Sequence, residues 1–194
     1  MKKLIAALFL IFASAVWAGD FEDGVAAYKK GDYITAASLF KKVAEQGESQ
    51  AQTLLALMYH GGEGVLQDYA EAARLFTLAA KQGDSDAQFS AGNAYRKGEG
   101  VLQDYVEAVR WYKLAAEQGN SSAQYNLALR YYYGEGVLQD YSLAHMWANL
   151  AAVSGDKQSQ KARDGFAREM TTQEISKAQA MAKKCLASKY NDCE

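Results

Sequence analysis

The stretch GEGVLQDY occupies residues 62–69 and recurs unchanged at 98–105 and 134–141, a spacing of 36 residues. Glycines next to an aspartate can form either a loop that holds a phosphate or a joint between two helices. A phosphate loop needs free amides at the start of a helix. Here the aspartate of each copy stands directly before a helical pattern, where its carboxylate would accept those amides itself. The stretch therefore predicts a joint between helices and not a ligand-binding loop.

Each part of this joint has an expected role. The first glycine ends one helix, and the second gives the loop conformational freedom. The aspartate begins the next helix as its N-cap. The valine and the leucine are expected to pack against the neighbouring helices.

Other columns of the sequence keep the same period, which identifies an internal repeat. Asp-Tyr pairs lie at 32–33, 68–69, 104–105 and 140–141. Glycines follow with the same spacing at positions 47, 83, 119 and 155. Because several independent columns share one register, chance does not explain the match. The chain is therefore expected to consist of repeated structural units.

Each period contains two helical patterns. In the segment after Asp68, small and apolar residues recur at spacings of three and four, which is typical of one helix face. Asp68 with Glu71 is predicted to form a capping box, and Gly83 to end this helix. The other helix is predicted to open with a serine N-cap followed three residues later by glutamine. These serines are Ser49, Ser85 and Ser121.

Two helices of about a dozen residues each cannot enclose a core alone, so neighbouring pairs must stack on one another. The chain contains no proline, and no segment has the pattern of a strand. The sequence therefore predicts an all-α fold, a right-handed α/α solenoid of stacked helix pairs.

The segment 123–155, AQYNLALRYYYGEGVLQDYSLAHMWANLAAVSG, closely resembles the Sel-one-like repeat (SLR), a relative of the tetratricopeptide repeat (TPR). Within residues 48–155, three copies match the family pattern, at about 51–83, 87–119 and 123–155. Residues 21–47 look like a TPR-like repeat with a shorter loop. The resemblance implies a TPR-like stack that acts as a scaffold.

Residues 156–194 lie beyond the repeats and are expected to form a C-terminal helical cap. Helical patterns run roughly over 157–170 and 172–188, and the second is predicted to begin with Thr171 and Glu174 as a capping box. An open solenoid needs such a cap to shield its last repeat.

Cys185 and Cys193 are the only cysteines. Eight residues of one continuous helix rise about 12 Å, which is beyond the reach of a disulfide, so a bond requires the helix to end between them. The sequence leaves open two unpaired thiols near the end of the chain. Secreted, cysteine-rich SLR proteins pin helices with a C-x7-C pair, and CLASKYNDC has this spacing, so the resemblance implies a disulfide.

The first residues have the pattern of a secretory signal peptide over 1–18. Lys2 and Lys3 precede an apolar run over 4–12, which is followed by small residues up to Ala18. The apolar segment is shorter than the about 20 residues that a membrane span needs. We therefore expect a secreted or periplasmic protein with no membrane insertion after cleavage of the signal peptide.

Charge argues against nucleic acid as a partner. Without Lys2 and Lys3 the chain has 19 basic and 23 acidic residues, a net charge of −4. Binding to a phosphate backbone needs a clustered positive surface, which the sequence lacks.

No catalytic constellation stands out. The residues SLFK at 38–41 fit the S-x-x-K pattern of β-lactamases, but the S-D-N and K-T-G motifs that accompany it are missing, and SGDK at 154–157 fits equally well. The only histidines, His60 and His145, are too far apart in sequence to indicate a metal site. We expect no enzymatic activity, no cofactor and no metal.

Stacked repeats form an extended concave surface, which favours binding of a protein or peptide. By resemblance to TPR domains, ligands lie against the exposed stripe of the first helix of each pair. These stripe positions vary between copies while inward positions repeat, so packing does not fix them. The predicted protein-binding groove comprises Phe89, Asn93, Arg96, Tyr125, Leu129 and Tyr132.

The expected function is a monomeric scaffold for protein–protein interaction. Neighbouring helices or the C-terminal cap could instead cover the groove residues. The alternatives are a structural or assembly role without a groove ligand, and a weak β-lactamase-like or cell-wall-related hydrolase.

Overall fold

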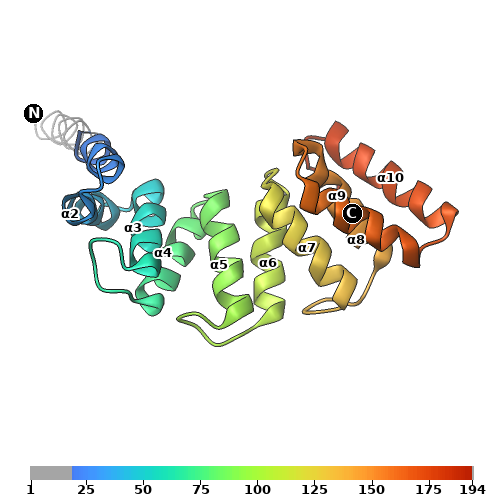
Figure 1. The fold of residues 1–194 in the computed structure, drawn as a ribbon, viewed down its shortest axis with the longest axis horizontal. Helices are drawn as coiled ribbons and strands as arrows, with labels where there is room; N and C mark the ends of the chain where they lie inside the picture. The colour runs from blue at the N-terminus through green and yellow to red at the C-terminus, as the bar shows by residue number, and fades with distance from the viewer. Residues whose placement is uncertain (1–18, 194) are drawn as a thin grey trace, which may run out of the picture. The chain divides into compact units, whose positions relative to one another are not determined.

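The structure is a computed structural model that describes residues 19–193, so the predicted signal peptide at 1–18 lies outside the described residues (Figure 1). Residues 19–193 form helices and contain no strand, which confirms the all-α fold of stacked helix pairs. A first helix covers 19–29. The remaining helices are α2 (Tyr33–Glu45), α3 (Ser49–Gly61), α4 (Tyr69–Lys81), α5 (Ser85–Lys97), α6 (Tyr105–Ala116), α7 (Ser121–Tyr133), α8 (Tyr141–Ala151), α9 (Lys157–Phe166) and α10 (Thr172–Ala187), with 3-10 turns η1 (Ala152–Ser154) and η2 (Ala167–Glu169).

The chain divides into two compact units, Met1–Gln82 and Gly83–Glu194. In the described part of the first unit, α3 packs on both α2 and α4. In the second unit, α5 packs on α6, α7 packs on α6 and α8, and α8 also contacts α9 and α10. Within each unit the repeat helices thus contact their neighbours along the chain, as expected for a repeat protein.

The helix ends confirm part of the capping predictions. Asp68 caps α4 by accepting the amides of Ala70 and Glu71, but the Glu71 side chain pairs with Arg74 and does not close a capping box. Thr171 and Glu174 form the predicted capping box of α10.

The serine N-caps predicted for the other helices are wrong by one residue. Glu48, Asp84 and Asn120 cap α3, α5 and α7, and the serines that follow are the first helical residues. The glutamines of the predicted boxes, Gln52, Gln88 and Gln124, are buried. They bridge helices instead: the Gln124 amide donates to the carbonyl of Ala116 at 3.1 Å, and Gln52 accepts from Gln82 at 2.9 Å.

The recurring loop is a joint, and its second glycine is needed for close packing. A Cβ on Gly64 would lie 2.2 Å from the carbonyl oxygen of Tyr33, and a Cβ on Gly136 would lie 2.2 Å from that of Tyr105. Both glycines also have positive φ angles, which disfavour other residues. The loop is therefore pressed against the start of the preceding repeat's second helix.

The leucine of the loop does not pack as expected. Leu66, Leu102 and Leu138 are each 91% exposed. The preceding valines are half-buried, and Val137 packs against the core of the second unit. Only the valine therefore contributes to the packing predicted for this pair.

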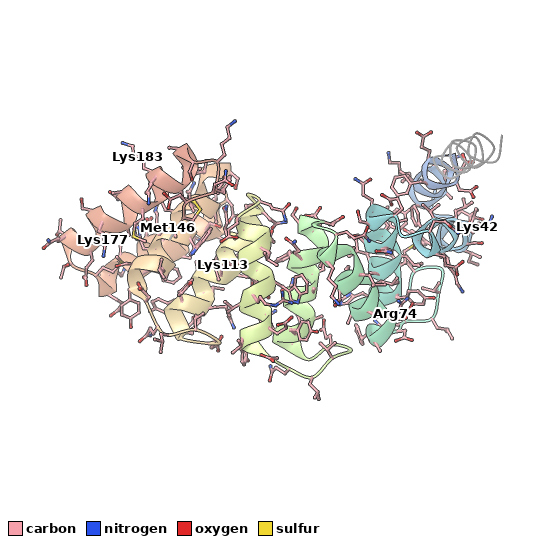
Figure 2. The ribbon with its side chains drawn as sticks, turned by 180° about the vertical axis from the view of Figure 1, so that it is seen from behind. Lys42, Arg74, Lys113, Met146, Lys177 and Lys183 are labelled. Carbon is pink, nitrogen blue, oxygen red and sulfur yellow. A yellow bond between two sulfur atoms is a disulfide. The ribbon has the colours of Figure 1, made fainter. Side chains whose placement is uncertain are left out.

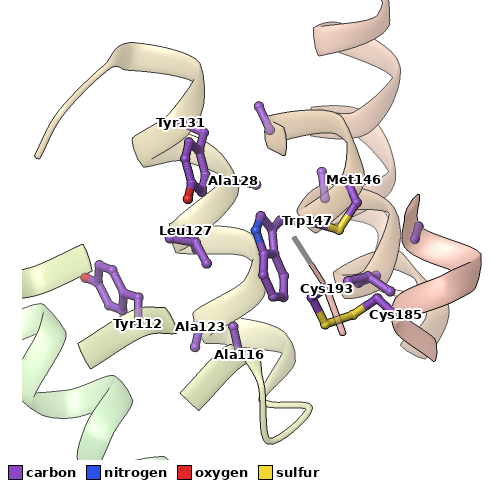
Figure 3. Close-up of a cluster of buried hydrophobic side chains, with 14 of the residues drawn as sticks. Tyr112, Ala116, Ala123, Leu127, Ala128, Tyr131, Met146, Trp147, Cys185 and Cys193 are labelled. Carbon is purple, nitrogen blue, oxygen red and sulfur yellow. A yellow bond between two sulfur atoms is a disulfide. The ribbon is translucent and has the colours of Figure 1, made fainter. Parts of the chain in front are cut away.

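The core of the second unit extends into the C-terminal helices. Trp147 of α8 is fully buried and lies between Leu127 of α7 and the disulfide of Cys185 and Cys193 (Figure 3). Helix α10 ends at Ala187, between the two cysteines, as the pairing required. The opposite face of α10 carries exposed lysines, two of which are labelled in Figure 2.

Candidate protein-binding groove

The predicted groove residues come from α5 and α7, the first helices of two consecutive repeats. Asn120 caps α7 and its side-chain amide also donates to Asp86 of α5 at 3.0 Å, which ties the beginnings of the two helices together. On each helix the predicted residues are spaced by four and three, so they lie on one face. None of the six is fully exposed or fully buried.

On α5, all three predicted residues contact Tyr112 of α6. The Tyr112 hydroxyl donates to Oδ1 of Asn93 at 2.8 Å and accepts from Nε of Arg96 at 3.3 Å. The ring of Phe89 lies 6.1 Å from that of Tyr112. Tyr112 is fully buried, and this burial raises its pKa, while Arg96 acts in the opposite direction.

Tyr112 can reach these residues because Gly92 leaves room for its ring. A Cβ on Gly92 would lie 2.6 Å from two ring atoms of Tyr112. The expectation that packing does not fix this stripe is therefore wrong for α5, since a buried tyrosine orients Phe89, Asn93 and Arg96. All three residues nevertheless remain partly exposed to solvent.

On α7, the C-terminal helices cover part of the stripe. The ring of Tyr132 stacks on Phe166 of α9, with centroids 4.4 Å apart and planes inclined by 22°. Leu129 packs against the core of the second unit. Tyr132 and Leu129 therefore belong partly to the interior, and the open part of the stripe lies nearer the beginning of α7.

A hollow of about 330 Å³ lies at that open part. Phe89 and Tyr125 contribute aromatic surface to it, and α9 contributes Gln158, whose amide donates to the Tyr125 hydroxyl at 2.9 Å. The full set of lining residues is Phe89, Ser121, Ser122, Tyr125, Asn126, Asp156, Gln158 and Ser159. We call this site the α5–α7–α9 hollow.

The polar rim of the hollow is largely preorganised. Asp156 caps α9 by accepting from the amide and the hydroxyl of Ser159 at 2.6 and 2.7 Å, and these hydrogen bonds lower the pKa of its carboxyl. Asn126 donates from its side chain to the carbonyl of Ser122 at 2.9 Å. Hydroxyl and amide groups next to two aromatic rings fit a polypeptide segment, which offers both backbone polar groups and side chains.

Two of the six predicted residues, Phe89 and Tyr125, line this hollow. Sequence reasoning missed Asp156, Gln158 and Ser159, because the repeat was taken to end at Gly155. The cap residues 84, 120 and 156 keep the 36-residue period, and this signal could have placed α9 as the first helix of a further pair.

Two features bear on other chemistry, namely metal ligands and the S-x-x-K pattern. No group of three or more His, Cys, Asp or Glu side chains within 19–193 is placed to hold a metal ion. Ser38 and Lys41 of the S-x-x-K pattern both lie on the exposed side of α2. Among these residues no helix is both long and apolar enough to cross a bilayer.

Two solved structures have similar folds. A Sel1 repeat protein from Oxalobacter formigenes is 32% identical, with a TM-score of 0.71 over 75% of this chain and 60% of that one. The c5321 protein, a protective antigen of uropathogenic Escherichia coli strains that displays an SLR fold, is 28% identical, with a TM-score of 0.63 over 90% of this chain and 46% of that one.

A curated relative matches a shorter region. HcpE of Helicobacter pylori, whose name gives β-lactamase as a conjectured activity, is 36% identical over 73 residues, which cover 35% of this chain and 21% of HcpE. The chain thus spans less than two thirds of the length of each of these three proteins.

The sequence model described as Sel1 repeat matches four consecutive segments, 18–48, 49–84, 85–120 and 121–156. The match includes the first segment, which has the shorter loop, and it extends without a gap over most of the chain. Helices α2 to α8 fall within these segments, and α9 and α10 lie beyond them. The chain therefore belongs to the Sel1 repeat family.

Proposed function

We propose that this protein is a non-enzymatic scaffold that binds a protein partner through the α5–α7–α9 hollow. Sel1 repeat proteins are generally protein-interaction scaffolds, and the fold is typically non-catalytic. The observation that carries the proposal is the hollow itself, in which Phe89 and Tyr125 are held half-exposed beside hydrogen-bonding groups. Aromatic side chains in such a position are common centres of binding energy.

Asn93 and Arg96 extend this binding surface along α5. Their contacts with Tyr112 reduce the side-chain entropy that a partner would otherwise have to restrict. Tyr132 and Leu129 act from the other side as support for α7, since α9 and the core hold them. The partner we expect is an extended peptide or a helix of another protein.

We place the protein in the periplasm or outside the cell. The sequence pattern of residues 1–18 supports this location, and so does the disulfide between Cys185 and Cys193, because disulfides persist in oxidising compartments. After removal of the signal peptide, the chain acts without membrane insertion.

The test compares the mature chain with the double variant Phe89→Ala and Tyr125→Ala. Cross-linking in the producing cell, followed by mass spectrometry, identifies the partner, and the variant should capture at least tenfold less of it. Leu102→Ala with Leu138→Ala is the matched control, because it removes two apolar side chains from exposed positions. All three proteins must have equal helicity and melting temperature. Undiminished capture by the Phe89→Ala and Tyr125→Ala double variant would favour docking through another face.

A β-lactamase-like activity is the weaker candidate, supported by the name of HcpE and by the S-x-x-K pattern. The mature chain should not hydrolyse a chromogenic cephalosporin. Turnover that disappears in Ser38→Ala would contradict the proposed scaffold function and establish acyl transfer.

A further inference from the structure

A second hollow lies in the first unit, on the second-helix side of the repeat at 49–84. It measures about 290 Å³ and is enclosed by α2, α3 and α4. Leu55, Leu75 and Leu78 provide apolar walls, and charged side chains stand around them. The lining residues are Lys41, Ala44, Glu45, Gly47, Gln52, Leu55, Tyr59, Glu71, Arg74, Leu75 and Leu78. We call this site the Leu75 hollow.

The repeat at 121–156 contains the same site two periods later, and there the chain fills it. Positions 41, 44, 45, 47, 52 and 59 carry the same residues as positions 113, 116, 117, 119, 124 and 131. Leu75 corresponds to Trp147, whose larger side chain is fully buried. The sites therefore share most of their frame. They differ at Leu75, which corresponds to Trp147, and at the charged Glu71 and Arg74, which correspond to Leu143 and Met146.

Tyr190 supplies a second ring at the filled site. Its ring carbon Cε2 lies 3.1 Å from the position of a Cβ on Gly119. In the equivalent position of the first unit, no described atom lies within 4 Å of a Cβ on Gly47 apart from its chain neighbours. The space beside Gly47 thus corresponds to the space that an aromatic ring occupies beside Gly119.

Arg74 lies where its guanidinium could contact an aromatic ring bound in the Leu75 hollow. In the repeat at 85–120, the guanidinium of Arg110 lies 4.2 Å from the ring centroid of Trp111. Arg74 occupies the same position before Leu75, and it pairs with Glu71 as Arg110 pairs with Glu107. Figure 2 shows Arg74 on the surface of the first unit. A guanidinium over an aromatic face is attractive.

We propose that the Leu75 hollow binds a tyrosine or tryptophan side chain of a partner protein. The chain's own filled site defines the chemistry of this occupant: an aromatic ring over the glycine, next to apolar walls. Tyr190 is presented by a disulfide-closed turn, so the occupant is expected to project from a similarly exposed turn. This site is independent of the α5–α7–α9 hollow and does not rest on it.

The probe is the synthetic, disulfide-closed peptide CLASKYNDC, which reproduces residues 185–193. Titration into the mature chain with labelled leucine methyl groups should give saturable shifts at Leu55, Leu75 and Leu78. The same peptide with alanine in place of tyrosine should give at least tenfold weaker binding. Shifts confined to other leucines, or none at these three, would overturn the proposal.

The decisive variant is Leu75→Trp, which introduces the residue that fills the equivalent position at 111 and 147. It should weaken peptide binding at least tenfold, while Leu138→Trp on an exposed loop should leave binding unchanged. Leu78→Asp, at a partly exposed wall position, gives a second way to impair the site if Leu75→Trp does not fold. Undiminished binding by a folded Leu75→Trp or Leu78→Asp protein would contradict the assignment.

Discussion

The repeats at 49–84 and 121–156 share the same framework of caps and buried residues, but they differ in how the space beside the second helix is packed. Both have an aspartate-capped second helix, a buried glutamine and a glycine after the second helix. In the first, Leu75 borders an open hollow, whereas in the last, Trp147 at the equivalent position is fully buried and the ring of Tyr190 lies beside Gly119. The shared caps, glutamines and glycines determine how the repeats stack. The residues that differ, such as Leu75 and Trp147, determine which surfaces stay open.

The largest expected effect is the loss of Trp147. Trp147→Ala should lower the free energy of unfolding of the second unit by about 3–5 kcal/mol, because it leaves a large cavity in a packed core. Leu75→Ala should cost roughly 2–3 kcal/mol, since its side chain already borders an open hollow. Urea denaturation measures both, and equal losses would mean that the two sites are packed alike.

The second largest change in the free energy of unfolding should come from removing the disulfide. This bond has no counterpart in the repeat at 49–84, and it holds the turn that carries Tyr190. Replacing both Cys185 and Cys193 by alanine should destabilise the second unit by about 2–3 kcal/mol. Helix α10 should stay docked, since Ala178 and Ala182 are buried against the core. Limited proteolysis should therefore cut first after Lys189 in the variant, and an unchanged cleavage pattern would show that packing alone holds the turn.

A pH effect should be specific to the last repeat, which has His145 where the repeat at 49–84 has Ala73. Burial lowers the pKa of His145, with Arg163 acting in the same direction and Asp164 against it. The unfolded chain binds a proton more readily, so the free energy of unfolding should fall as the pH drops below about 6.5, by at most about 1.4 kcal/mol per pH unit. Denaturation at pH 7.5 and pH 5 should show a smaller decrease for His145→Val, and an identical decrease would assign the effect to other groups.

The smallest effect should come from a feature that both repeats share. Leu66→Ser and Leu138→Ser should each change the free energy of unfolding by less than about 0.5 kcal/mol, because both side chains are 91% exposed. A loss above 1 kcal/mol at either position would show that the loop leucine is packed in solution.

The fold could be predicted because its determinants are local and periodic. Asp68 and Gly83 act within single helix ends, and the 36-residue period identifies the stack. The serine caps were wrong because Ser85 and Asp84 are both good capping residues, and only the position of the first helical turn distinguishes them.

The site could be predicted only in part, because its exposure depends on contacts between distant segments. The helical spacing predicted Phe89 on the stripe of one helix and Tyr125 on that of another, and both residues line the same hollow. Phe166 covers Tyr132 because of the way α9 packs, and Tyr112 orients Arg96 because of the way α6 packs. A single sequence does not specify such contacts.

The partner is proposed to bind where Phe89 and Tyr125 are held half-exposed. The most direct measurement places the photoreactive residue p-benzoylphenylalanine at position 125 or at position 138 of the mature chain and irradiates the producing cells. We expect a partner adduct from position 125 that is lost on Phe89→Ala, and at most a trace from position 138. The same adduct from position 138, or none from position 125, would contradict it.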